Sequence, residues 1–358
     1  MSRHRSVLVL AIVAGAAMVF ASPLLAGPLR KEQVSAKAKW LVHADVKAFL
    51  ASKTGSFVLE ELKKKGLELM LDNIREAFAF DVTKDLKSLT VYGSTFEKHA
   101  AIILLHATMD RDRLTEVLKG NETYRELKYA GHTVHQWTDN PQSPSPGPTR
   151  FGVFHADDLA VVTEDVRLLQ QALDVLDKKA DSLAARTAAK SPPSESGKPF
   201  LTAYVAELPP IGEGKPEGVI LGKLASGHLA AGESKERLRV HVTLTAKTAR
   251  TATNLRKIAE GFLALIDLAS PEQAGGTPAA SKDRAVIGDM VVPAEVIALL
   301  KDITVTAKGR TVRVDADVSV ASATALLRRI IGQDEAEKTE AEGAGTQAEP
   351  AKTEAAEK

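Results

Sequence analysis

The segment Ala100–Ala107 (AAIILLHA) is apolar at consecutive positions rather than at alternate ones. Side chains of an extended strand point alternately to the two faces of a sheet, so a strand of this kind must be covered on both sides. We therefore expect this segment to be a central strand covered on both faces, or a packing seam.

Other segments show the period of two that is typical of strands with one buried face. Val240, Val242 and Leu244 alternate with polar residues, and so do Val312 and Val314. Such strands are typical of antiparallel sheets. The polar face of this second sheet is expected to be wetted and to carry Arg239, His241, Thr243, Thr245, Thr304, Thr306, Arg313, Asp315 and Asp317.

Apolar residues at intervals of three and four predict four helices. The stripes run through Leu67–Ala77, Val166–Leu176, Ala252–Ile266 and Val320–Ile330. Aromatic residues make up only 4% of the chain, so Phe262 in the longest stripe is expected to supply a large share of a core. The competing interpretation is that this stripe is an exposed groove for a partner.

The predicted elements occur twice in a similar order. Each half begins with a lead strand, at Trp40–Val46 and at Leu201–Leu208, and continues with strand pairs that are each followed by a helix. Residue identities barely match, so this internal repeat rests on order and length. We expect an α+β fold of two related modules, 36–183 and 198–332, joined by a linker at 184–197. Each module would be a mostly antiparallel sheet with helices packed on one face.

The N-terminus has the order of a secretory signal. Arg3 and Arg5 precede the uncharged apolar run Val7–Phe20, and small residues follow it. The run is shorter than the about 20 residues that span a bilayer, which disfavours a retained membrane helix. Residues 1–26 are therefore predicted to be a signal peptide, cleaved after Ala21 or Ala26. The mature protein would be periplasmic or extracellular, with no membrane span.

Composition excludes several classes of protein. The chain of 358 residues has no cysteine, so an exported protein of this sequence cannot use disulfides. Loss of Arg3 and Arg5 takes the formal net charge from +1 to −1, which gives no electrostatic basis for binding nucleic acid. Residues 333–358 hold eight acids, three lysines and no large apolar residue. They are expected to form a disordered acidic tail, with an acidic docking arm as the alternative.

Histidines are the first candidates for chemistry. His132 and His135 form an H-x-x-H pattern on a predicted strand, where residues three apart point to opposite faces, so we expect no shared metal ion. His43 and Asp45 lie two apart on a strand and face the same way. A carboxylate that orients a histidine is a recurrent catalytic or metal-site device. It needs a third partner that the sequence does not identify, so we interpret this pair as part of a solvated strand face.

No other motif predicts a catalytic, cofactor or metal site. The sequence lacks the G-x-S-x-G, H-E-x-x-H and Walker A patterns. Asp157-Asp158 is interpreted as a turn, Met109–Arg113 (MDRDR) as a helix start, and Gly275-Gly276 as part of a linker. Large aromatic side chains that could stack on a ligand are interpreted as core anchors, namely Trp40, Trp137 and Tyr92.

The layout resembles that of uncharacterised exported bacterial proteins built from a twice-repeated α+β unit. The resemblance rests on Trp40–Val46 (WLVHADV), on Asp85–Gly93 (DLKSLTVYG) with the apolar strand after it, and on the hairpin and helix Arg150–Leu176. It covers roughly residues 38–331 and implies no known activity, cofactor or site. We therefore expect an exported non-enzymatic module that binds an envelope protein or a ligand of unknown identity, without a cofactor. The alternative is a hydrolase whose site is not visible as a motif.

We expect export to remove the first 21 or 26 residues, because the apolar run is too short to remain as a membrane anchor. N-terminal sequencing of the exported protein measures this directly. Recovery of an intact Met1 or Ser2 on a membrane-bound product would contradict it.

Overall fold

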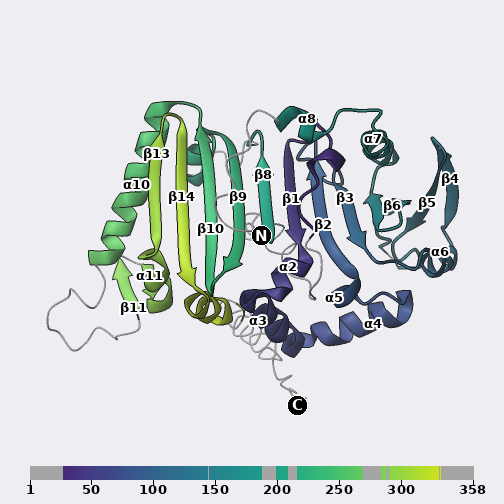
Figure 1. Ribbon diagram of the computed structural model, residues 1–358, viewed down its shortest axis with the longest axis horizontal. Coiled ribbons are helices and arrows are strands. Elements are labelled where there is room, and N and C mark those ends of the chain that lie inside the picture. The colour runs from purple at the N-terminus through teal and green to yellow at the C-terminus, as the bar shows by residue number, and fades with distance from the viewer. Residues whose placement is uncertain are drawn as a thin grey trace, which may run out of the picture.

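The computed structural model describes residues 27–143, 145–187, 199–208, 216–268, 284–287, 290–329 and 331. Its strands are β1 (Trp40–Asp45), β2 (Leu86–Gly93), β3 (Ile102–Ala107), β4 (Arg125–Tyr129), β5 (His132–Thr138), β6 (Thr149–Ala156), β7 (Leu159–Thr163), β8 (Leu201–Val205), β9 (Leu224–Ser234), β10 (Arg237–Ala246), β11 (Arg284–Ile287), β12 (Met290–Pro293), β13 (Ile303–Lys308) and β14 (Thr311–Ser319). Twelve of them form one antiparallel sheet in the order β13-β14-β10-β9-β8-β1-β2-β3-β7-β6-β5-β4 (Figure 1). Strands β11 and β12 pair separately.

Helices flank this sheet. They are the short η1 (Lys31–Gln33) and η2 (Lys63–Leu67), and α2 (Val46–Ala51), α3 (Lys53–Leu62), α4 (Glu68–Phe78), α5 (Val82–Asp85), α6 (Arg111–Lys119), α7 (Val166–Leu176), α8 (Leu183–Thr187), α9 (Pro216–Leu221), α10 (Ala249–Leu268) and α11 (Ala294–Leu300). Residues 320–329 are also helical. Among the described residues, none of the helices combines the length and the apolar character needed to cross a membrane.

The two halves of the chain meet at the middle of the sheet. Strand β1 pairs antiparallel with β8, and the register places His43 opposite Thr202. The expected α+β character and the mostly antiparallel pairing are confirmed. The sequence predicted a separate sheet for each half, whereas the structure has one continuous sheet. The reason is that β1 and β8 pair with each other, so neither lead strand presents unpaired backbone groups.

Both faces of the sheet are covered in the first half. Leu104 is buried in a core cluster that contains Leu169 and Leu173 of α7. Its neighbour Leu105 packs against a second cluster that contains Leu50 of α2. The prediction that Ala100–Ala107 supplies a strand covered on both faces is confirmed. Helices on one face only were expected, but this half has α7 on one face and α2 to α5 on the other.

A carboxylate from the second half caps a helix of the first half. Glu233, at the end of β9, accepts hydrogen bonds from the backbone nitrogens of Lys53 and Thr54, each at 2.9 Å. The Thr54 hydroxyl donates to the same carboxylate at 2.7 Å. These nitrogens belong to the first turn of α3, where backbone donors lack intrahelical partners and a negative charge is favourable. The β9–β10 hairpin is thereby tied to α3.

The second half has one polar and one apolar sheet face. Register places Arg239 opposite Asp317 and His241 opposite Asp315 on the polar face. The Arg239 Nε lies 3.3 Å from an Asp317 carboxylate oxygen, so cross-strand ion pairs line this face. On the opposite face, Leu244 and other apolar strand residues pack near α10.

The longest helix departs from its predicted packing. Near its start, Ala252 is buried and Leu255 packs against the third core cluster. Further along, Phe262 is 43% exposed, and Ile258 and Leu265 are exposed beside it. Phe262 was expected to be a core residue, and this prediction is wrong. Helical spacing identifies an apolar face but not its neighbour, and α10 runs along the β13 edge of the sheet, where its later turns have less to cover (Figure 1).

Three predicted segments lie wholly or partly outside the described residues. They are the signal peptide 1–26, residues 188–197 of the linker, and the tail 333–358. The first residues of the expected linker belong to α8. After β8, the described chain forms α9 before β9 begins at Leu224.

Phe262→Ala should lower the free energy of unfolding by less than about 1 kcal/mol, because the side chain is already partly in water. Leu173→Ala, at a position with no exposed area, should cost about 2–5 kcal/mol by opening a cavity. Urea unfolding of both variants compares them. Equal losses would show that Phe262 is packed in solution.

Candidate metal centre

The first ligand candidate stands at the end of a tight turn. Residues Tyr129 and His132 are paired across the β4–β5 hairpin, with Ala130 and Gly131 between them at φ of 49° and 91°. Positive φ at both central residues is typical of the two-residue turn that matches strand twist, and glycine adopts it without strain. This turn fixes His132 as the first residue of β5.

The second candidate comes from the neighbouring strand. The β5–β6 register pairs His135 with Gly152. Extending this register by three residues, back along β5 and forward along β6, sets His132 opposite His155. Their rings stack, with centroids 5.2 Å apart and an angle of 26° between the planes.

The third candidate ends a helix. Asp177 is the C-terminal cap of α7, and its backbone nitrogen donates to the Leu173 carbonyl. The next residue, Lys178, has φ of 61°, a position that usually holds glycine. The Lys178 nitrogen donates to the Val175 carbonyl and the Lys179 nitrogen to the Asp174 carbonyl. These two bonds, with Lys178 in the left-handed conformation, form a Schellman motif at the end of α7. Placing a non-glycine residue there costs about 1–2 kcal/mol.

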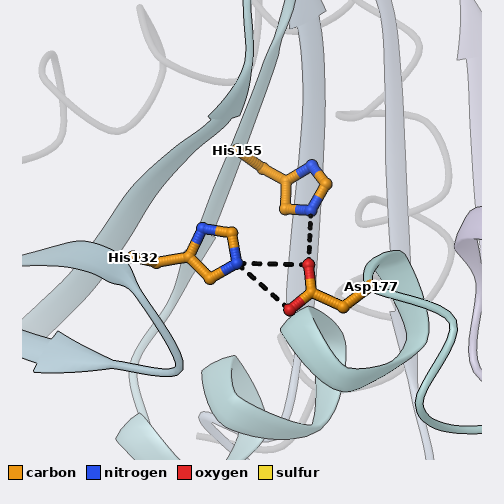
Figure 2. Close-up of side chains that lie close together, drawn as sticks. All are labelled: His132, His155 and Asp177. Atoms are coloured by element: carbon orange, nitrogen blue, oxygen red, sulfur yellow. Dashed lines mark hydrogen bonds and ion pairs between the residues drawn. The ribbon is translucent and has the colours of Figure 1, made fainter.

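The three side chains converge on the Asp177 carboxylate (Figure 2). The His132 Nε2 lies 3.1 Å and 3.2 Å from its two oxygens. The His155 Nε2 lies 3.1 Å from the first of them. The Lys179 Nζ donates to the second oxygen at 2.8 Å. One carboxylate therefore serves two imidazoles and an ammonium group.

The cluster is partly exposed to solvent. The side chains of His132, His155 and Asp177 are 21%, 18% and 17% exposed, and that of Lys179 is 52% exposed. The hydrogen bond from Lys179 and those from the two histidines hold the pKa of Asp177 well below its usual range, against the opposing effect of burial. The same contact raises the pKa of Lys179. Asp177 is therefore ionised at neutral pH.

This donor set suits a transition-metal ion. One ligand atom of each residue lies within 4.8 Å of the other two. Zinc bonds of about 2.0–2.1 Å in tetrahedral geometry separate adjacent ligand atoms by about 3.3 Å, close to the present nitrogen–oxygen distances. Two imidazoles and one carboxylate are a recurrent ligand set that leaves at least one position open. Binding would require each Nε2 to lose its proton to the other ring nitrogen or to solvent.

A second contact holds the β4–β5 hairpin against α7. The Tyr129 hydroxyl donates to the Asp174 carboxylate at 3.2 Å, one helical turn before Asp177. Tyr129 and Asp174 thus fix the distance between the β4–β5 turn and the helix end. This second contact holds His132 close to Asp177 without the help of a metal ion.

The H-x-x-H pair does not form a site of its own. His132 contacts Asp177, whereas His135 is buried and its Nδ1 hydrogen bonds to the Tyr124 hydroxyl at 2.9 Å. Burial is the first cause of the lowered pKa of His135. The structure therefore gives the two histidines different partners.

The interpretation of His43 and Asp45 as a solvated face is wrong. They are 2% and 1% exposed, because the Gly27 carbonyl lies against His43 and Asp45 is enclosed at the start of α2. The His43 Nε2 donates to the Gly27 carbonyl at 2.9 Å, so its Nδ1 accepts from the Thr90 hydroxyl at 2.8 Å. Asp45 caps α2 by accepting from the Ala48 nitrogen at 2.9 Å. Each side chain is thus engaged in structural hydrogen bonds.

The acidic motifs have the local structures expected of them. Asp157-Asp158 forms the turn between β6 and β7, where Asp157 pairs with Arg111 at 2.9 Å. Asp110 caps α6 by accepting from the Arg113 nitrogen. Gly275-Gly276 lies outside the described residues.

Of the aromatic residues, Tyr92 is buried in the first core cluster, as expected. The two tryptophans are half-buried and each packs over a strand glycine. A Cβ on Gly93 would lie 2.8 Å from the Trp40 ring, and one on Gly152 would lie 3.0 Å from Trp137. Both indole nitrogens donate hydrogen bonds, to Thr95 and Asp139 respectively.

Sequence reasoning did not find His155 or Asp177. They lie 23 and 45 residues after His132, and neither spacing matches a metal-binding motif. The one usable signal was the hairpin register, which aligns His132 with His155 once the pairing of β5 and β6 is known.

No protein-family model matches the chain, and no curated protein matches it. Among solved structures, crystal form III of TP0453 is similar with 7% identity and a TM-score of 0.43, covering 84% of this chain and 98% of that one. Crystal form I of TP0453 is similar with 8% identity and a TM-score of 0.42, covering 84% and 97%.

Burial lowers the pKa of His43 from 6.5 to about 4, so its neutral form stabilises the fold fully above pH 6.5 and less as pH falls toward 4. At pH 5 this histidine alone should cost about 2 kcal/mol of unfolding free energy relative to pH 7. His43→Gln cannot take up that proton, so its unfolding free energy should change less between the two pH values. Urea unfolding at pH 7 and pH 5 measures this change. The same loss of unfolding free energy between the two pH values in parent and variant would contradict the prediction.

Proposed function

We propose that this protein is an exported, non-enzymatic module that binds a divalent transition-metal ion through His132, His155 and Asp177. The observation that carries the proposal is the convergence of two imidazole nitrogens on one carboxylate at 3.1 Å. Such distances need little adjustment for tetrahedral coordination.

The chemistry of the donors supports zinc or a similar ion over calcium or magnesium. Calcium and magnesium prefer six or more oxygen ligands, whereas this cluster offers two nitrogens and one carboxylate. Zinc accepts imidazole and carboxylate together. The candidate ligand is therefore a borderline ion of the zinc, nickel or copper group.

Export supports a binding role for such a site. The predicted signal peptide would place the protein where metal ions enter the cell envelope. A site at the surface of a rigid sheet and helix, with partly exposed ligands, is open to ions from solution. We propose a role in binding the ion rather than in chemistry upon it.

We further propose that the two halves are copies of one α+β unit. The strand orders β1-β2-β3-β7-β6 and β8-β9-β10-β14-β13 run outward from the centre of the sheet in the same sequence of steps. Strands β4 and β5 extend this pattern in the first half only. The candidate metal centre would then be an addition to one copy, because His132 stands on β5.

The protein should bind zinc with one ion per chain, and His132→Ala, His155→Ala and Asp177→Asn should each weaken binding by more than about 100-fold. Loss of a partner that only orients a ligand already costs about 10–100-fold, and these residues are the ligands themselves. Isothermal titration of the metal-free protein with zinc measures the affinity.

His99→Ala is the matched control, since it removes an exposed histidine of the same protein that is paired with Glu164. Its zinc affinity should equal that of the parent. Titration with magnesium and calcium should give no binding. An unchanged zinc affinity in all three ligand variants would exclude the proposed site.

A further inference from the structure

We infer that Lys179 competes with the metal ion for the Asp177 carboxylate and so makes the site exchangeable rather than permanent; this inference rests on the proposed function. The Lys179 Nζ donates to Asp177 at 2.8 Å, and both histidines converge on the same carboxylate. The ammonium group and a metal ion bound by the histidines would therefore share Asp177. Lys179 would determine how tightly and for how long an ion is held.

The backbone holds Lys179 in this position. Lys178 adopts the left-handed conformation that glycine prefers, and this turns the chain back over the end of α7. The Lys179 nitrogen then donates to the Asp174 carbonyl at 2.7 Å. The side chain of Lys179 is thereby directed to a carboxylate only two residues away, so the pair forms with little loss of chain entropy.

The carboxylate has limited capacity. One Asp177 oxygen receives His132 and His155, and the other receives His132 and Lys179. A metal ion held by both imidazoles and the first oxygen would stand close to the ammonium on the second. Repulsion between the two cations would then oppose binding, and the ammonium bond would make Asp177 a weaker donor.

The competition is moderate because Lys179 is half exposed. At 52% exposure its ammonium group can turn into water, which screens the repulsion. The expected result is an affinity lowered by a small factor and a faster release of the ion. A permanent structural site would instead enclose its ion with four protein ligands.

A different role predicts the opposite effect. Groups that hydrogen bond to a ligating carboxylate often orient it and strengthen binding. If Lys179 acted in that way, its removal would weaken binding. The two roles therefore differ in the sign of one measured change.

The experiment compares Lys179→Met with Lys178→Met in the full chain. Both variants remove one exposed lysine and the same charge, but only Lys179 donates to Asp177. We expect Lys179→Met to bind zinc roughly threefold to tenfold more tightly than the parent, with release slowed by a similar factor. Lys178→Met should stay within about twofold of the parent, because solvent screens a charge that makes no direct contact. Isothermal titration gives the affinity, and stopped-flow transfer of zinc to a chromogenic chelator gives the release rate.

Two outcomes overturn the inference while the proposed function stands. In one, Lys179→Met binds zinc more weakly than the parent; in the other, both lysine variants change equally. If the parent binds no zinc at all, the proposed function itself fails. A smaller gap between parent and Lys179→Met at high salt would further support the inference, because salt screens the repulsion.

Discussion

The pairing of β1 with β8 determines much of what surrounds it. Strand β1 pairs with β2 on one side and β8 on the other, and all of its residues after Trp40 are buried, although they include a histidine and an aspartate. Burial of such groups is costly unless they are hydrogen bonded. His43 bonds to Thr90 and Gly27, and Asp45 caps α2. These two side chains of β1 thus also fix the start of α2 and the position of Gly27 in the chain before β1.

Patterns within one element were predictable from the sequence, whereas relations between elements were not. Consecutive apolar residues identified β3 as covered on both faces, and alternation separated the two faces of β10 and β14. The joining of both halves in one sheet depends on which edges meet, and no residue pattern encodes that choice. The same limit explains Phe262, because three-four spacing cannot tell whether a helix ends over a sheet or beyond its edge.

The candidate metal centre shows this limit most clearly. His132 was noticed for its spacing to His135, but strand geometry separates that pair. Its actual neighbours come from a cross-strand register and from the end of a helix, both of which depend on tertiary packing.

The cap that Glu233 places on α3 has a consequence for the integrity of the molecule. Together with the β1–β8 ladder, it joins the halves through hydrogen bonds that do not involve the peptide link between α8 and β8. The covalent connection is therefore redundant for holding the halves together once they have formed. A chain nicked between α8 and β8 would remain a single particle, and the two pieces made separately would be candidates for complementation.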